Sequence, residues 1–135
     1  MVNIANTYGK NAGKIWNTLE KWGSLNPTQL MKKTKLNKED LYTALGWLAK
    51  EDKIYFENNN FSLGNYNWDN TIGSNAGKVW NIIDTCEEID KTYVPKLADI
   101  NEIDFYYAMG WLAKEDKINT KKVKPPKSIT KITKK

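Results

Sequence analysis

Residues 46–54 read Gly-Trp-Leu-Ala-Lys-Glu-Asp-Lys-Ile, and residues 110–118 read the same nine letters. A second stretch is repeated upstream, where residues 11–17 and 75–81 differ at a single position. Both pairs are separated by the same offset, so the two copies align without a gap, with roughly half of their positions identical. The chain is therefore a tandem duplication.

The repeat predicts two small domains, residues 1–64 and 65–120, which we call repeat 1 and repeat 2, followed by a lysine-rich tail, residues 121–135. No apolar run reaches the roughly 18 residues of a membrane-spanning helix, and the N-terminus lacks the pattern of a signal peptide. We therefore expect a cytoplasmic protein, associated with the nucleoid if it binds DNA.

Two residue types are missing, and their absence limits the possible functions. The chain has no histidine and one cysteine, Cys86, which excludes a Cys/His zinc site and the usual catalytic triads. The paired acids lie beside lysines at expected helix ends, and no glycine-rich phosphate loop is present. We predict a protein without catalytic activity, metal or cofactor. All 21 basic residues are lysine, which disfavours strong reading of G·C pairs, a task that arginine performs best.

The start of repeat 1 predicts a short strand and then a helix. Val2 and Ile4 alternate with polar residues, as Tyr66 and Trp68 do at the matching positions. An apolar face with helical spacing follows, predicting a helix over about residues 10–22 that Gly23 ends. Its inward residues are Ala12, Ile15, Trp16, Leu19 and Trp22.

Two further helices and a hairpin complete the repeat. Asn26-Pro27 predicts the start of a second helix through Thr34, and Asn37 is the expected N-cap of a third. We place Leu41, Ala44, Leu45, Leu48 and Ala49 on its inward face, and Lys38, Glu39, Tyr42, Thr43 and Lys50 outward. Strands at residues 54–56 and 61–63 around an asparagine turn then predict a β-hairpin. Three helices closed by a hairpin indicate a winged helix-turn-helix, mainly α with a small β wing.

The two repeated motifs also resemble a known family. Ala-Gly-Lys-Ile-Trp at residues 12–16 and Ala-Leu-Gly-Trp-Leu-Ala-Lys-Glu-Asp-Lys-Ile at residues 44–54 are similar to a small bacterial and archaeal winged-helix family of unknown function. Its members usually have one such domain, and here both repeats match. Ala-Met-Gly-Trp at residues 108–111 and Pro95 depart from the pattern. The resemblance implies the winged-helix fold and suggests nucleic-acid binding, without an established activity.

Repeat 2 is expected to differ from repeat 1 in three places. Cys86 replaces Trp22 and is interpreted as a small buried residue. Pro95 requires the second helix to begin near Thr92 or to be kinked. Pro125-Pro126 is expected to prevent a second hairpin, so that the wing is degenerate and the lysine tail is a flexible basic arm.

The charges of the two repeats differ in sign. Repeat 1 has nine lysines and six acidic residues, whereas repeat 2 has five lysines and ten acidic residues. The leading hypothesis is therefore a protein that binds double-stranded DNA with weak sequence preference, placing the third helix of repeat 1 in the major groove. The predicted contacts are phosphate-binding Lys32, Lys33, Lys35 and Lys38, base-facing Asn37, Tyr42 and Thr43, wing residues Asn58, Asn59 and Asn60, and tail residues Lys121, Lys122, Lys124, Lys127, Lys131, Lys134 and Lys135.

Aromatic residues support a second hypothesis, a protein-interaction adaptor. Ile103, Tyr106 and Tyr107 are expected near the outward face of repeat 2, in contact with repeat 1 or with another chain. Trp47 and Trp111 either pack within their own repeat or form a seam between the two repeats. A third alternative is attachment to RNA or the ribosome through the tail, and a plain solubilising role for the tail also remains open.

Overall fold

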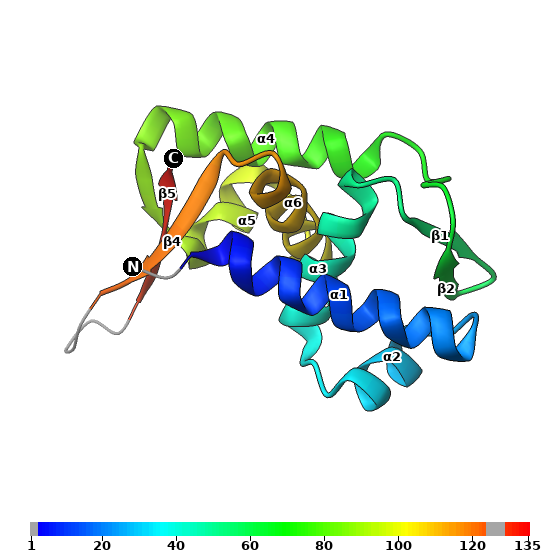
Figure 1. Cartoon of the computed structure of the whole chain (residues 1–135). Helices are drawn as coiled ribbons and strands as arrows, with labels where there is room; N and C mark the ends of the chain where they lie inside the picture. The colour runs from blue at the N-terminus through cyan, green and yellow to red at the C-terminus, as the bar shows by residue number, and fades with distance from the viewer. Residues whose placement is uncertain (1–2, 124–128) are drawn as a thin grey trace.

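The computed structural model describes residues 3–123 and 129–135 and contains two copies of a three-helix unit (Figure 1). The elements of the first copy are α1 (Ile4–Trp22), α2 (Pro27–Thr34), α3 (Lys38–Lys50), β1 (Ile54–Glu57) and β2 (Asn60–Leu63). Those of the second are α4 (Thr71–Cys86), β3 (Glu88–Asp90), the 3-10 turn η1 (Lys91–Tyr93), α5 (Val94–Ala98), α6 (Glu102–Lys114), β4 (Ile118–Lys122) and β5 (Thr130–Lys134). The predicted mainly helical fold of two tandem winged helix-turn-helix units is confirmed.

Local sequence signals set the helix boundaries in repeat 1. The Asn26 side chain accepts a hydrogen bond from the backbone N–H of Gln29, while the Gln29 side chain accepts one from the Asn26 N–H, forming a capping box. Asn37 caps α3 through a single hydrogen bond, which its side chain accepts from the Asp40 N–H at 2.8 Å. The hairpin also forms as predicted, with Asn58 and Asn59 in the left-handed region that its tight turn requires.

The strand predicted at the start of each repeat is wrong. Ile4 is the first residue of α1, which begins about six residues earlier than expected and is capped by the Asn3 side chain. Tyr66 and Trp68 lie in the loop before α4 and belong to no strand. Because these positions pack against the opposite repeat, their alternation with polar residues reflects a contact remote in sequence.

The two hydrophobic cores share side chains across the repeat boundary. Ile4 and Tyr8, from the first turns of α1, are buried in the core that α4, α5 and α6 build. The equivalent residues of repeat 2, Trp68 and Ile72, pack in the core of repeat 1. Each repeat therefore contributes the beginning of its first helix to its neighbour, so the two units form one interlocked body.

The third helices of the two repeats, α3 and α6, make the most extensive contact between any two elements. The Lys38 ammonium lies 3.0 Å from a Glu102 carboxylate oxygen at their N-terminal ends, and Lys50 lies 3.5 Å from Glu115 at their C-terminal ends. The two N-terminal ends thus lie together, as do the two C-terminal ends, which requires α3 and α6 to run side by side in the same direction. Figure 1 shows α3 and α6 together at the centre of the molecule.

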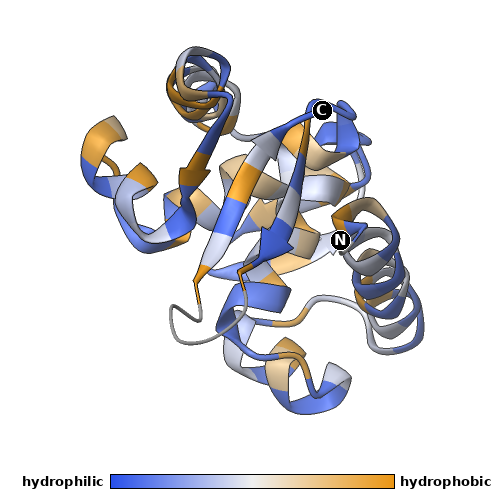
Figure 2. Ribbon diagram, turned by 90° about the vertical axis from the view of Figure 1, so that its left-hand side faces the viewer, coloured by the Kyte–Doolittle hydropathy of each residue, from blue (hydrophilic) through white to orange (hydrophobic). Residues whose placement is uncertain are grey.

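The second wing is present, which corrects the prediction that it is degenerate and, for residues 121–123 and 129–135, that the tail is a flexible arm. β5 pairs antiparallel with β4 on one side and with β3 on the other. Figure 2 shows β4 and β5 side by side across one end of the molecule. Ile132 is fully buried and lies opposite Ile89 and Thr120, as Phe61 lies opposite Leu25 and Phe56 in repeat 1.

The second hairpin is longer than the first, which explains the wrong prediction. Thr120 and Phe56 are equivalent in the repeat alignment, but their strand partners, Ile132 and Phe61, are not. The alignment matches Phe61 with Pro125, so the second hairpin has seven more residues than the first between these paired positions. Pro125-Pro126 falls outside the described residues. Proline in the connection is compatible with a hairpin, because the ladder hydrogen bonds lie elsewhere.

Two smaller predictions concern Cys86 and Pro95. Cys86 is exposed, which contradicts the expected burial, because both it and Trp22 occupy the last position of a helix that extends beyond the core. Pro95 lies in the first turn of α5, and η1 fills the preceding residues from Lys91, so the second helix starts late, as the proline requires. Within the described part of the chain, no helix is both long and apolar enough to span a membrane.

Candidate functional site

The repeated nine-residue stretch faces its own copy across the α3–α6 contact. An added Cβ on Gly46 would lie 2.1 Å from the Tyr107 carbonyl oxygen, and one on Gly110 would lie 1.8 Å from the Thr43 carbonyl oxygen. Only glycine permits this close backbone approach. An approximate twofold axis relates α3 to α6, so the two helices contact each other through equivalent surfaces.

Charged and aromatic side chains extend this symmetric contact. Lys50 pairs with Glu115 at 3.5 Å, and Lys114 pairs with Glu51 at 3.4 Å. The same two lysines lie over tryptophan rings of the opposite repeat, Lys50 over Trp111 at 4.9 Å and Lys114 over Trp47 at 5.0 Å.

Trp47 and Trp111 contact both their own repeat and the other one. The Trp47 ring also lies against Gly9 of α1, and the Trp111 ring lies against Gly73 of α4. A Cβ added to Gly9 would lie 3.3 Å from the Trp47 ring, and one added to Gly73 would lie 3.4 Å from the Trp111 ring. The sequence left two alternatives for these tryptophans, packing within their own repeat or forming a seam between the repeats. Each ring does both, because it packs against both hydrophobic cores.

Of the residues predicted on the outer face of repeat 2, Tyr107 lies against the core of repeat 1. The Tyr107 ring packs edge-on against Tyr42 at 5.2 Å and against Trp68 at 5.3 Å. Burial raises the pKa of the Tyr107 hydroxyl. Tyr106 packs against the core of repeat 2, while Ile103 is half-buried. In this structure, repeat 1 is the partner of Tyr107.

This arrangement contradicts base reading by Thr43 and covers part of Tyr42. Thr43 is fully buried, and its hydroxyl donates to the Glu39 carbonyl oxygen at 2.9 Å. Tyr42 is half-buried beneath Tyr107. The prediction treats α3 as a helix with one buried face, but α6 packs on a second face, the one that carries Thr43. The two third helices are also in contact, whereas two half-sites on DNA require helices about 34–36 Å apart.

The lysines around the turn of repeat 1 remain accessible. Lys32, Lys33 and Lys35 are exposed, and they make no ion pair with any residue that the structure describes. Lys38 is exposed but pairs with Glu102, which lowers the pKa of that carboxyl through the hydrogen bond it receives. Asn37 is exposed, and its side-chain oxygen is used in the helix cap.

An exposed tryptophan joins these lysines, and the sequence interpretation missed it. Trp22 is 54% exposed, with the Lys33 ammonium 3.8 Å and the Lys21 ammonium 5.2 Å from its ring centre. Helical spacing alone puts Trp22 on the buried stripe of α1, but Gly23, the residue that ends the helix, directly follows it. We call Lys21, Lys32, Lys33 and Lys35 with Trp22 the basic surface.

The wing of repeat 1 lies next to the loop that joins α1 to α2. Phe61 and Leu25 exchange backbone hydrogen bonds of 2.8 and 3.0 Å, which fixes the hairpin beside this loop. Asn58 and Asn59 at its tip are exposed, and Asn60 is half-buried at the start of β2. Figure 1 shows this hairpin and α2 at the end of the molecule away from β4 and β5.

The lysines of the predicted tail mostly neutralise the acidic second repeat. Lys121 and Lys131 both bind Glu88, at 2.7 and 3.0 Å, and lower the pKa of its carboxyl. Lys134 binds Asp84 at 2.7 Å, and Lys135 binds Asp116. These four lysines therefore do not form a free basic arm. Lys122 is exposed, whereas Lys124 and Lys127 lie outside the described residues.

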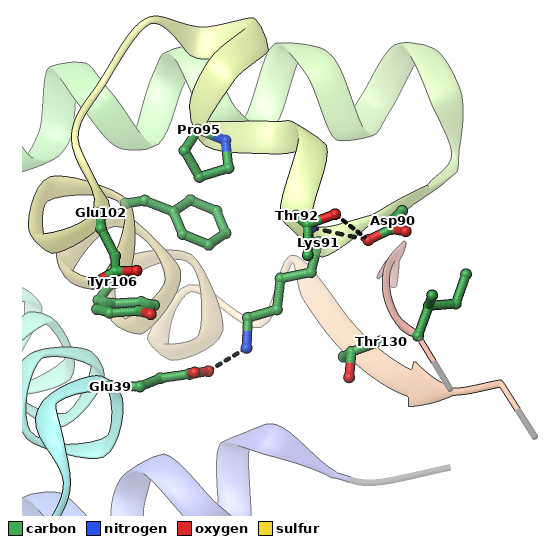
Figure 3. Close-up of a pocket in the computed structure, with 10 residues that line it drawn as sticks. Glu39, Asp90, Lys91, Thr92, Pro95, Glu102, Tyr106 and Thr130 are labelled. Carbon is green, nitrogen blue, oxygen red and sulfur yellow. Dashed lines mark hydrogen bonds and ion pairs between the residues drawn. The ribbon is translucent and has the colours of Figure 1, made fainter. Parts of the chain in front are cut away.

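A pocket of about 530 Å³ lies where repeat 2 meets the N-terminal end of α3 (Figure 3). Lys91 crosses it to form an ion pair with Glu39, which ties η1 to α3. Burial and neighbouring carboxylates raise the pKa of Tyr106 to about 12, so its hydroxyl stays protonated at neutral pH. The pocket is therefore part of the contact between the two repeats. In the described part of the chain, no three acidic or cysteine residues lie close enough together to hold a metal ion.

Comparison with known proteins identifies the family. A family model described as a winged helix-turn-helix domain (DUF2582) matches residues 4–66 and again residues 68–131. No curated protein and no solved structure is significantly similar to the chain. Winged helix-turn-helix domains are typically non-enzymatic, and this fold suggests an interaction with nucleic acid. Since the two matches span nearly the whole chain, the protein belongs to the DUF2582 winged helix-turn-helix family and carries its domain twice.

Proposed function

We propose that the protein binds nucleic acid, with double-stranded DNA as its target, through phosphate contacts made by the basic surface of repeat 1. The observation that carries this proposal is the group of four exposed lysines without ion-pair partners among the described residues. Repeat 2 has Thr85, Lys96, Leu97 and Asp99 at the equivalent positions, so only repeat 1 presents this charge. Phosphate groups attract such a surface whatever the base sequence.

The proposed binding mode differs from a standard helix-turn-helix. Because α6 packs on the face of α3 that carries Thr43, the N-terminal end of α3, with Asn37 and Lys38, is the part that approaches the duplex from this repeat. Contacts to phosphate position a protein on DNA without reading its sequence. Weak sequence preference is therefore expected, and the exposed tip of the first hairpin, Asn58 and Asn59, is available to touch the neighbouring backbone.

The salt dependence of binding tests this proposal quantitatively. Four phosphate contacts predict a slope of about −3 to −4 in a plot of log K against log salt concentration, at about −0.9 per contact. Fluorescence anisotropy with a labelled duplex of about 20 base pairs would measure it. Changing Lys32 and Lys33 to Glu should remove binding at about 50 mM salt.

A matched control comes from the repeat itself. Lys96 occupies in repeat 2 the position that Lys32 occupies in repeat 1, and both are exposed. Lys96→Glu should change affinity much less than Lys32→Glu, although both alter the net charge equally. Equal losses would show a response to net charge alone, and a slope near zero would exclude phosphate binding.

A second candidate, a protein-interaction adaptor, is favoured by one observation on α5 and its flanking turn. Tyr93 and Leu97 are each 61% exposed, where repeat 1 has Gln29 and Lys33. Exposed large apolar side chains at this helical spacing are typical of a protein contact. Exchanging them for the repeat 1 residues, Tyr93→Gln with Leu97→Lys, should abolish capture of a protein partner and leave DNA affinity undiminished.

A further inference from the structure

Two equivalent pockets occur on the surface, one in each repeat, and the sequence motifs meet in them. The first has a volume of about 340 Å³ and lies between α1 and the end of α3. The second has a volume of about 270 Å³ and lies between α4 and the end of α6. Eight of the residues lining the first have their counterparts in the repeat alignment lining the second, namely Gly9, Ala12, Gly13, Trp16, Trp47, Leu48, Glu51 and Lys53.

All eight of these residues are identical in the two repeats, although only about half of the repeat positions are. The helix contact explains some of this identity, because Trp47 and Glu51 also take part in the symmetric α3–α6 interface. Trp16 and Trp80 are half-buried and belong to the first helix of each repeat, which makes no part of that interface. Trp80 packs in part against the core of repeat 2, and the Lys117 ammonium lies 5.4 Å from its ring centre. The exposed part of each indole lines the pocket.

Gly13 and Gly77 lack any structural reason to be glycine. Both lie in the middle of a helix, where glycine lowers stability by roughly 0.5–1 kcal/mol relative to alanine. A Cβ added at either position would meet no atom within 4 Å, and neither residue has a positive φ angle. The absence of a side chain therefore leaves open space on the pocket floor, where a bound group can lie against the helix backbone.

The lining determines which chemical group fits. Two indole rings supply flat apolar walls, against which another planar ring can stack. At the first rim, Glu51 lies between Lys53 at 3.6 Å and Lys114 at 3.4 Å. At the second, Glu115 lies between Lys117 at 3.8 Å and Lys50 at 3.5 Å. Two cations around one anion favour a negatively charged ligand and oppose a cationic one.

The pocket volumes restrict the ligand to a single ring system. Sites for small molecules usually measure about 300–1,000 Å³; the first pocket, about 340 Å³, lies at the lower end of that range, and the second, about 270 Å³, lies just below it. We propose that the two pockets are a pair of equivalent binding sites for a planar aromatic group that carries a negative charge, such as a nucleotide. They share no residue with the basic surface, so this proposal and DNA binding can fail independently.

The test is a titration of the full-length protein with adenosine 5′-monophosphate, followed by the indole N–H signals of its six tryptophans. Trp16, Trp47, Trp80 and Trp111 should shift, whereas Trp68, which lines neither pocket, should not. Trp22 reports on the basic surface, and a shift confined to Trp22 would overturn the proposal. The uncharged nucleoside adenosine should bind about threefold to fivefold more weakly.

Filling one pocket at a time provides the matched controls. Gly13→Leu should remove the shifts of Trp16 and Trp47 and preserve those of Trp80 and Trp111, and Gly77→Leu should do the reverse. Both variants should fold, because a Cβ at either position meets nothing within 4 Å and the rest of the leucine side chain enters the pocket. The proposal is overturned if no indole signal moves up to about 10 mM nucleotide. It is equally overturned if the shifts survive in the filled pockets, if inorganic phosphate alone reproduces them, or if adenosine binds as tightly as the nucleotide.

Discussion

Replacing Gly110 by alanine should destabilise the protein, although alanine is the better helix former. The added Cβ would lie 1.8 Å from the Thr43 carbonyl oxygen and 2.8 Å from the Trp47 nitrogen. Both are backbone atoms of α3, which cannot rotate away as a side chain could. Restoring an ordinary contact of 3.4 Å requires α3 and α6 to separate locally by about 1.6 Å.

The size of the effect follows from two opposing terms. Alanine contributes about 0.5–1 kcal/mol through helix propensity. A gap of about 0.5–1 Å already removes a quarter to a half of the dispersion energy between facing atoms, and overpacked cores typically lose about 1–3 kcal/mol, occasionally more. Because the separation affects the most extensive contact in the fold, we expect a net loss of about 2–3 kcal/mol.

Urea unfolding followed by tryptophan fluorescence measures this loss as a lower midpoint with an unchanged slope. Gly13→Ala is the matched control, because the same substitution in mid-helix meets no atom there and should stabilise by about 0.5–1 kcal/mol. The two substitutions should therefore have opposite signs. If Gly110→Ala were as stable as Gly13→Ala, the close approach of α3 and α6 would be wrong.

Three further predictions address other contacts. Lys38→Glu should lower the urea midpoint slightly, because it places a carboxylate beside Glu102. Adding Glu102→Lys should restore the wild-type midpoint. If the double exchange fails to do so, the ion pair is not formed in solution. Ile132→Ala should destabilise by about 2–5 kcal/mol because its side chain is fully buried in the core of repeat 2, whereas Lys122→Ala on the neighbouring strand should change stability by less than about 0.5 kcal/mol; a harmless Ile132→Ala would restore the flexible-tail interpretation. The Glu88 carboxyl has a pKa below its usual 4.5 because Lys121 and Lys131 donate hydrogen bonds to it, so its contribution to stability is complete above about pH 4.5 and is lost as the pH falls through the lowered value. Amide exchange in β5, corrected for its intrinsic pH dependence, should accelerate over that range in the wild type and stay level in Glu88→Gln.

Features set by neighbouring residues could be predicted from the sequence. Asn26 and Asn37 cap helices through contacts within three residues, and the apolar period of α2 and α3 is local as well. The asparagine turn of the first hairpin is equally local. These signals were sufficient to identify the winged helix-turn-helix.

The wrong predictions for the burial of Cys86 and Trp22 concern helix ends, but the others have a common physical origin in contacts between distant residues. A single apolar stripe on α3 predicts an outward Thr43, but this residue faces α6, which belongs to the other repeat. Ile4 resembles a strand residue because the core that its helix turn enters belongs to repeat 2. β5 departs from the repeat alignment because of the longer hairpin, and its neighbour β3 precedes both α5 and α6 in the chain. No local pattern identifies the partner in any of these contacts.

The covalent joining of the two repeats has a consequence for behaviour at low concentration. If the α3–α6 contact held two separate chains together, its stability would depend on protein concentration, and dilution would dissociate it. In this chain a short connection between β2 and α4 fixes the local concentration of each repeat around the other. The interlocked cores should thus survive dilution to any level, with a melting temperature independent of concentration. A protein of this design remains assembled even when a cell contains only a few copies of it.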